Sequence, residues 1–319
     1  MSNKPAGLSN DSLWPRAGGW PSPDDIAPGK RIDAALVGIP ASQTSLSATN
    51  AHETPDAIRA ALFRYSPALM QDRGVLDKNL RNDPAIIDLE ELTVADFGNV
   101  TDPDSPAGEA RTIALMADAA KASELVIALG GDNSITVAAA LGVWGSDLET
   151  AGLITLDAHY DLRDGVSNGS PVRRLIEAGM NPDRIVQIGI QDFANSVAYA
   201  RRAQELGITV IHRDELARRH IADVMADALS IAGAAGGPIH VDLDVDVCDR
   251  SVAPACPASV PGGISAYELR QAARAAGKHS QVHSIDLAEI DATMDAPDGR
   301  TIRLAALCVL EAVAGLSQR

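Results

Sequence analysis

Two acidic residues and a histidine stand at alternate positions directly after a short apolar stretch. The stretch, residues 152–156, is apolar and partly β-branched, which is typical of a buried strand. Asp157, His159 and Asp161 follow it at i, i+2 and i+4. Alternate residues of an extended chain share one face. We therefore expect these three side chains to converge on one point beyond the end of the strand.

A second acidic stretch, residues 240–247, has the same build. Polar and apolar residues alternate strictly in it, which predicts a strand whose polar face carries Asp242, Asp244 and Asp246. Neighbouring carboxylates on that face are expected about 7 Å apart, because each residue of a strand advances the chain by about 3.3 Å. Like charges at that spacing are unfavourable unless a cation lies among them or water screens them. The two stretches together indicate a site for two divalent metals.

The remaining sequence alternates between expected strands and helices. Strands are predicted at residues 34–40, 86–89, 92–96, 124–129, 152–156, 184–190, 208–212, 240–247 and 282–287. Helices are predicted to begin at residues 55, 135 and 171 and to cover 108–121, 193–206, 221–234, 265–276 and 301–314. This alternation is typical of repeated βαβ units and a mainly parallel sheet. We assign residues 31–319 to one α/β domain and residues 1–30, rich in proline, glycine and serine, to a loose arm.

Four candidate functional residues fall at the same end of four different predicted strands. They are Asn133, Asp157, Asp244 and Glu289. In open parallel sheets, ligands bind beyond the carboxyl ends of the strands. The agreement among separate strands therefore predicts a single site, and the polar loop at residues 41–54 is long enough to reach over it.

The composition excludes several classes of function. The 319-residue chain is 46% hydrophobic and 22% charged, as in soluble proteins, and no apolar run reaches the roughly 18 residues of a membrane helix. A formal net charge of −16 without a lysine or arginine run argues against a nucleic-acid partner. The three cysteines fit no metal spacing and leave one unpaired, and residues 1–28 lack the apolar segment of a secretory signal. We expect a cytoplasmic protein.

The ligand types at the expected site suggest a reaction. Carboxylates with one imidazole form an oxygen-rich set that suits Mn²⁺ better than Zn²⁺. Asp157 and Asp244, first at each strand end, are the expected bridging ligands. Two metals about 3.5–4 Å apart lower the pKa of a shared water toward about 7, which yields a bridging hydroxide as nucleophile at neutral pH. Glu289 is placed to hold a cationic amidine or guanidine, so we expect hydrolysis of a C–N bond.

Three motifs in this chain resemble the signatures of the ureohydrolase family, which includes arginase, agmatinase and formimidoylglutamase. They are GGDNS at 130–134, DAHYD at 157–161 and DVDVCD at 244–249, and the resemblance covers about residues 33–315. It implies a three-layer α/β/α fold around a parallel eight-stranded sheet, a binuclear Mn²⁺ site and a trimer or hexamer. Carried over by motif, the ligands of one metal are Asn133, Asp157, Asp161 and Asp244, and those of the other are Asp157, His159, Asp244 and Asp246.

Four positions depart from the family pattern. Asn133 stands where histidine is usual, and since an amide oxygen is a weaker ligand than imidazole, we expect the first metal to bind less tightly. A turn residue that touches no metal is the alternative interpretation of Asn133. Asn168 occupies the place of a histidine that shuttles protons in arginases and agmatinases. Asp242 replaces serine or threonine, and Arg250 replaces a common proline. Formimidoylglutamases lack the shuttle histidine, so this chain is most similar to them.

Arginines near the expected pocket favour a substrate that carries carboxylates. N-formimidoyl-L-glutamate has two, and a guanidinium binds a carboxylate through two parallel hydrogen bonds. The candidate substrate ligands are Arg163, Arg173, Asn168 and Glu289. The alternative interpretations are that Arg163 pairs with Asp164 and that Arg173 is a solvated residue of the first helical turn.

The resemblance and the residues together predict a homo-oligomeric formimidoylglutamase that depends on Mn²⁺ and releases glutamate and formamide. Asp161 and Glu289 are the expected catalytic residues: Asp161 passes a proton from the attacking water to the leaving amine, and Glu289 holds the cationic nitrogen. Two alternatives stay open. One is an agmatinase or another guanidino-acid hydrolase that releases urea. The other is a metal-poor, non-catalytic family member, which the asparagines at 133 and 168 would suit.

Overall fold

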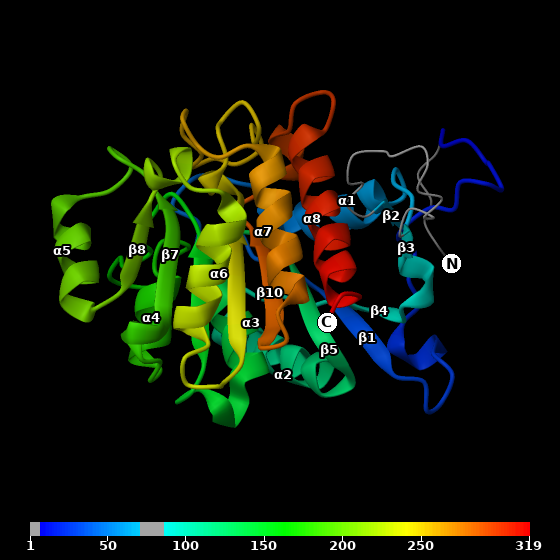
Figure 1. The fold of residues 1–319 in the computed structure, drawn as a ribbon, viewed down its shortest axis with the longest axis horizontal. Coiled ribbons are helices and arrows are strands. Elements are labelled where there is room, and N and C mark those ends of the chain that lie inside the picture. Colours follow the sequence, from blue (N-terminus) through cyan, green and yellow to red (C-terminus); the bar gives the residue numbers. More distant parts are fainter. Residues whose placement is uncertain (1–6, 71–85) are drawn as a thin grey trace, which may run out of the picture.

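A computed structural model describes residues 7–70 and 86–319, in which a large sheet lies between two layers of helices (Figure 1). The strands are β1 (Ile32–Ile39), β2 (Ala68–Met70), β3 (Ile86–Asp88), β4 (Val94–Asn99), β5 (Ser123–Gly130), β6 (Gly152–Leu156), β7 (Ile185–Ile190), β8 (Thr209–His212), β9 (Ile239–Asp244) and β10 (Val282–Ala288). The helices are α1 (Thr54–Leu62), α2 (Pro106–Ala122), α3 (Ile135–Trp144), α4 (Pro171–Glu177), α5 (Val197–Leu206), α6 (Ile221–Ala232), α7 (Ala266–Lys278) and α8 (Arg300–Leu316).

The large sheet has eight strands in the order β4-β1-β5-β10-β9-β6-β7-β8. Each neighbouring pair is parallel. This confirms the predicted fold class, a three-layer α/β/α arrangement around an eight-stranded sheet. The short strand predicted at residues 86–89 is present as β3, which pairs with β2 in a separate antiparallel ribbon and lies outside the large sheet.

Both faces of the sheet are buried under helices. In β5, Leu125, Ile127 and Leu129 belong to the core beneath α1, α6, α7 and α8, which Figure 1 shows on the near side for α6, α7 and α8. Val126 and Ala128 point the other way, into the core with α2 and α3. Burial on both faces explains why the central strands are continuous apolar runs in the sequence.

Two differences from the predicted element bounds affect the site. The helix expected over 193–206 begins at Val197, so residues 191–196 form a turn at the carboxyl end of β7. The acidic strand ends at Asp244, and residues 245–247 form a 3₁₀ turn. The N–H of Asp246 donates to Oδ1 of Asp244 at 2.8 Å, which is a local side-chain bond that competes with the extended chain. The capping box of Ser265 and Glu268 is present as predicted.

The segment predicted as a loose arm, residues 1–30, packs against its own chain where the structure describes it. The N–H of Ala17 donates to the carbonyl of Tyr65, and the N–H of Asp96 donates to the carbonyl of Pro21. Ala17 is buried, and Trp20 packs against the main core. Residues 17–21 therefore contact the rest of the chain, whereas residues 1–6 lie outside the described part. Within residues 7–70 and 86–319, no helix has the length and apolar character needed to cross a bilayer.

Candidate metal centre

The candidate residues follow four neighbouring strands in the middle of the sheet. Asn133 comes after β5, Glu289 after β10 and Asp157 after β6, while Asp244 is the last residue of β9. Ala288 pairs with Asp244, and Leu156 pairs with Leu243, so these strand ends lie level with one another. The sheet order β5-β10-β9-β6 thus assembles one site from residues that are far apart in the sequence.

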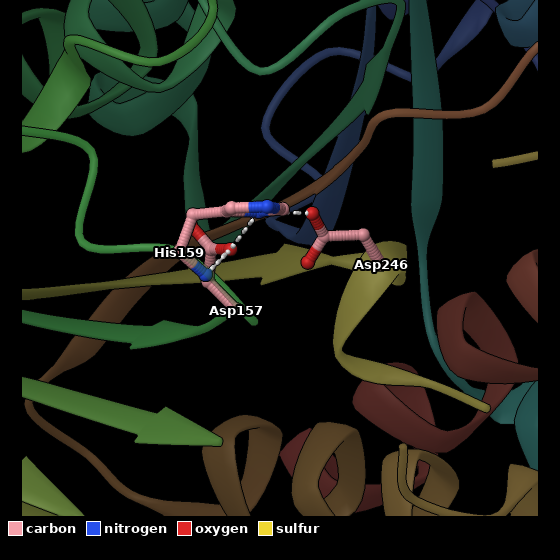
Figure 2. A group of neighbouring side chains, drawn as sticks. All are labelled: Asp157, His159 and Asp246. Carbon is pink, nitrogen blue, oxygen red and sulfur yellow. Dashed lines mark hydrogen bonds and ion pairs between the residues drawn. The ribbon is translucent and has the colours of Figure 1, made fainter. Parts of the chain in front are cut away.

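His159 lies between two buried carboxylates (Figure 2). Its Nδ1 is 2.6 Å from Oδ2 of Asp246 and 3.4 Å from Oδ1 of Asp157. One possible ligand atom from each of the three residues lies within 4.8 Å of the others. Oδ2 of Asp157 is buried without a hydrogen-bond partner, which is unfavourable for a carboxylate oxygen. The donor set and this orphaned oxygen fit a divalent cation.

The backbone of the DAHYD motif, residues 157–161, holds these side chains in place. Oδ1 of Asp157 accepts the N–H of His159 at 2.6 Å. Oδ1 of Asp246 accepts the N–H of Ala158 at 2.9 Å, which ties the end of β9 to the end of β6. Asp161 and Asp244 are also buried and line the same cavity as His159 and Asp246. The carboxylates that the sequence predicted as metal ligands are therefore brought together with the histidine.

Burial and mutual repulsion raise the pKa of most of these carboxyl groups. Burial is the largest cause for Asp157 and Asp244, and the charges of neighbouring aspartates add to it. Burial also raises the pKa of Asp161, to about 7. Asp246 is the exception: burial would raise its pKa, but the charge of His159 and its hydrogen bond outweigh burial and lower it. Burial lowers the pKa of His159, but Asp246 outweighs that effect and raises it to about 9.

Asn133 lies in the site, but its amide oxygen faces away from the acids. Its Nδ2 donates to Oδ2 of Asp161 at 2.6 Å, and its Oδ1 accepts from the hydroxyl of Thr136 at 2.9 Å. An amide nitrogen offers no lone pair to a metal, and the oxygen is engaged elsewhere. In this orientation the amide nitrogen of Asn133, which is no metal ligand, faces Asp161. The role of Asn133 as a metal ligand stays a prediction.

Glu289 accepts two hydrogen bonds on one oxygen. The N–H of Asn133 and the Nδ2 of Asn168 donate to its Oε1 at 2.8 Å and 2.6 Å. Burial raises the pKa of Glu289 to about 8, although these two bonds act in the opposite direction. Oδ1 of Asn168 also accepts the N–H of Leu46 at 3.0 Å. Asn168 thus joins Glu289 to the loop at residues 41–54, which does reach the site.

A cavity of about 410 Å³ lies over the acid cluster, and Arg163 is on its wall. Arg163 is exposed, and its guanidinium makes no ion pair within the described parts of the chain. The alternative pairing with Asp164 does not occur, because Oδ1 of Asp164 lies 2.9 Å from Nη1 of Arg202. The guanidinium of Arg163 is therefore available to a ligand in the cavity.

The structure contradicts the prediction that Arg173 binds substrate. Nε of Arg173 donates to the carbonyl of Arg163 at 2.6 Å, and its Nη2 donates to the carbonyl of Gly165. Its remaining nitrogen pairs with Glu177. Arg173 does not line the cavity. It instead binds the back of the loop that presents Arg163, whose carbonyl groups occupy the guanidinium in place of a substrate.

Asn195 is a residue of this site that the sequence analysis missed. Its Oδ1 accepts the N–H of Tyr160 at 3.1 Å, and its Nδ2 donates to the carbonyls of Ala158 at 2.8 Å and of Gln191 at 3.3 Å. It therefore braces the backbone on both sides of His159. The sequence signal was a polar turn directly after β7, which the helix predicted over 193–206 concealed.

Residues 32–315 match the model of the arginase family. The chain belongs to the arginase family. Two of its curated relatives are formimidoylglutamases: that of Halalkalibacterium halodurans is 33% identical over 90% of this chain and 88% of its own length, and that of Bacillus subtilis is 32% identical over 88% and 86%. The crystal structure of the Bacillus subtilis formimidoylglutamase aligns with a TM-score of 0.80 and 27% identity, covering 98% of this arginase-family chain and 95% of the other.

Proposed function

We propose that this protein hydrolyses N-formimidoyl-L-glutamate to L-glutamate and formamide. The observation that carries the proposal is the placement of an acid cluster and an unpaired guanidinium, Arg163, on the walls of one cavity. A cationic formimidoyl group suits the acids, and a carboxylate suits the guanidinium. The two relatives named formimidoylglutamase, 33% and 32% identical, support the same activity.

Two Mn²⁺ ions per subunit are part of the proposal. Asp157, His159, Asp161, Asp244 and Asp246 would hold them, since four carboxylates and one imidazole form the hard donor set that Mn²⁺ prefers. When bound, the metals lower the pKa of water toward about 7 and so supply a nucleophile at neutral pH. The structure of a formiminoglutamase from Trypanosoma cruzi with Mn²⁺, which aligns with a TM-score of 0.78 at 22% identity, agrees with this choice of metal.

The side chains around the metals orient the substrate and move the proton. The Glu289 carboxylate holds the cationic nitrogen, and the Asn168 and Asn133 bonds to Oε1 fix its direction. Water adds to the formimidoyl carbon, the bond from that carbon to the glutamate nitrogen breaks, and the water oxygen leaves in formamide. Asp161 takes a proton from the attacking water and returns one to the departing amine.

A guanidino acid is the second candidate substrate, and Arg163 is the observation that favours it. The guanidinium of Arg163 would bind the carboxylate of any amidine or guanidine acid of suitable length. A guanidinopropionase from Pseudomonas aeruginosa is 32% identical to the chain over 59% of its residues. Agmatine, which has no carboxylate and carries a second cation, would gain nothing from Arg163.

The protein's assembly and location are likewise proposed. We infer a homo-oligomer, a trimer or hexamer, in the cytoplasm, with neither nucleic acid nor membrane as partner. The family resemblance supports the oligomer. The net charge of −16 opposes binding to polyanions.

Product analysis of the Mn²⁺-loaded protein tests the proposed reaction. We expect equimolar formamide and glutamate from N-formimidoyl-L-glutamate and no urea from agmatine. Urea from 3-guanidinopropionate at a higher kcat/KM than formamide from formimidoylglutamate would replace the first candidate by the second. Absence of every product, together with fewer than one metal per subunit after Mn²⁺ loading, would favour the metal-poor, non-catalytic alternative.

A further inference from the structure

Phe193 is a fully exposed aromatic residue on the wall of the cavity. Its relative exposure is 106%, and it lines the cavity together with Leu46, which is 58% exposed. The two residues come from different loops, one after β7 and the other after β1. Phe193 also has φ +63°. A left-handed backbone is unfavourable for a residue with a bulky side chain.

Other residues with a strained backbone conformation line the same cavity as Phe193. In the described parts of the chain, Asp102, Asp161, Phe193 and Glu289 are the non-glycine residues with positive φ. The last three all line the cavity. Unfavourable backbone conformations persist where the surroundings impose them, and they gather at functional sites. Phe193 therefore shares this property with two residues of the proposed chemistry.

The turn that carries Phe193 is held at both ends. The N–H of Gln191 donates to the carbonyl of Ala158 at 3.1 Å, and Asn195 bonds to the backbone of Ala158, Tyr160 and Gln191. The hydroxyl of Ser196 accepts the N–H of Tyr199 and caps α5 at its N-terminus. These bonds attach the turn to the segment that contains His159. They leave the ring of Phe193 without packing partners while fixing its place beside the cavity.

We propose that Phe193 determines substrate specificity by covering the short apolar chain between the two charged ends of the bound substrate, together with Leu46. The proposal rests on the proposed function, because it needs an amidine at the acids and a carboxylate at Arg163. The atoms between these ends are methylene groups, which carry no charge. Among the cavity residues, Phe193 and Leu46 are the large exposed apolar side chains that can remove such a chain from water.

Variants of Phe193 test this role through a separation of KM from kcat. Phe193→Ala is expected to raise KM for formimidoylglutamate about tenfold, because the apolar cover is lost, while kcat changes by less than about threefold. Phe193→Leu should keep most of the affinity. Phe193→Gly should raise KM as much as Phe193→Ala but give a higher melting temperature than Phe193→Ala, because glycine adopts positive φ without strain. Val197→Ala, at a residue that is 69% exposed and does not line the cavity, is the matched control.

A fluorescence measurement tests the same contact without turnover. The Phe193→Trp variant is loaded with Mn²⁺ and saturated with L-glutamate, with saturation established by calorimetry. The emission of the added tryptophan, obtained by subtracting the spectrum of the unsubstituted protein, should shift to shorter wavelength. If the protein turns over a guanidino acid in place of formimidoylglutamate, the proposed function fails, and the same variants are measured with that acid. Unchanged KM in both Phe193→Ala and Phe193→Gly would overturn the proposal. So would a changed oligomeric state with unchanged KM, which would assign Phe193 to a subunit contact.

Discussion

The amide nitrogen of Asn133 lies 2.6 Å from Oδ2 of Asp161. The family resemblance places an imidazole, which can bind metal, at this position. This chain instead has an amide that donates a hydrogen bond to Asp161, a proposed metal ligand. The bond satisfies one oxygen of a buried carboxylate. In the proposed two-metal site, Asp161 would then bind metal without help from the end of β5, and one of the two metals would have fewer protein ligands.

Replacing Asn133 by histidine should therefore strengthen metal binding. In Asn133→His, the imidazole adds a ligand, and we expect the weaker of two Mn²⁺ equivalents to bind roughly 10- to 100-fold more tightly, the range seen when groups around a metal site change. Isothermal titration calorimetry measures both affinities. Asn133→Ala, which removes the bond to Asp161 without adding a ligand, is the control. Equal affinities in Asn133→His and the unsubstituted protein would show that residue 133 does not face a metal.

The metal-free protein should lose stability as pH rises. The folded pKa values of Asp161, Glu289 and His159 are raised to about 7, 8 and 9. Each group therefore binds its proton more tightly in the folded than in the unfolded state, and its contribution is present below the unfolded pKa and lost as pH rises through the folded pKa. The melting temperature with a chelator should fall between pH 5 and pH 8.

Added Mn²⁺ should reverse this loss, because a metal at 100 times its Kd contributes about 2.7 kcal/mol to a folded state that alone binds it. Calorimetric scans with and without Mn²⁺ across this pH range make the comparison. If the melting temperature of the metal-free protein instead rises from pH 5 to pH 8, the negative charges of the buried acids are balanced by other protein groups and not by bound protons.

Replacing Asp157 by asparagine should lower activity and raise the stability of the metal-free protein. In Asp157→Asn, a neutral amide of the same shape replaces a carboxyl group whose charged form is disfavoured by burial and by Asp161 and Asp246. We expect metal binding and turnover to fall at least about a thousandfold, in line with the size of metal-assisted catalysis, while the metal-free protein melts at a higher temperature. Asp118→Asn, an exposed charge on α2, is the matched control. A less stable metal-free Asp157→Asn would indicate that Asp157 has a structural role in the absence of metal.

Arg163 should act on substrate affinity. Arg163→Ala removes the guanidinium from the cavity wall, and the loss of a charge-assisted bond to a carboxylate, about 1.5–3 kcal/mol, predicts a KM raised roughly 10- to 100-fold with a smaller change in kcat. Arg201→Ala is the control, because Arg201 is exposed on α5 and does not line the cavity. Initial rates with formimidoylglutamate give both constants. An unchanged KM would remove the reason for preferring a carboxylate substrate.

The sequence predicted the parts of the site that depend on local pattern. Asp157 and His159 follow a strand at alternate positions, and Asp244 ends a strand of alternating polarity, so their approach at the carboxyl ends followed from strand geometry. The three-layer fold followed from alternating strands and helices. The order of the strands did not, since it depends on contacts between distant segments, and that order is what sets Asn133, Glu289, Asp244 and Asp157 side by side.

The errors concern side chains whose partners are distant or backbone groups. Arg173 was expected at the substrate because of its charge, but the carbonyls of Arg163 and Gly165 bind its guanidinium. The orientation of the Asn133 amide depends on Thr136 on one side and Asp161, 28 positions away, on the other. Asn195 and Phe193 were hidden because their segment continues the composition of α5. In the structure, Asn195 bonds to the backbone of Ala158 and Tyr160 and so attaches this turn to the segment that contains His159.

We propose that Asp157 and Asp244, at the carboxyl ends of β6 and β9, hold a metal between them. Anomalous diffraction from crystals of the Mn²⁺-loaded protein at pH 8 tests it most directly, because it locates each manganese atom among the side chains. We expect anomalous peaks within bonding distance, about 2.0–2.3 Å, of carboxylate oxygens of Asp157 and Asp244. Crystals soaked at saturating Mn²⁺ that show no peak between these two side chains would contradict it.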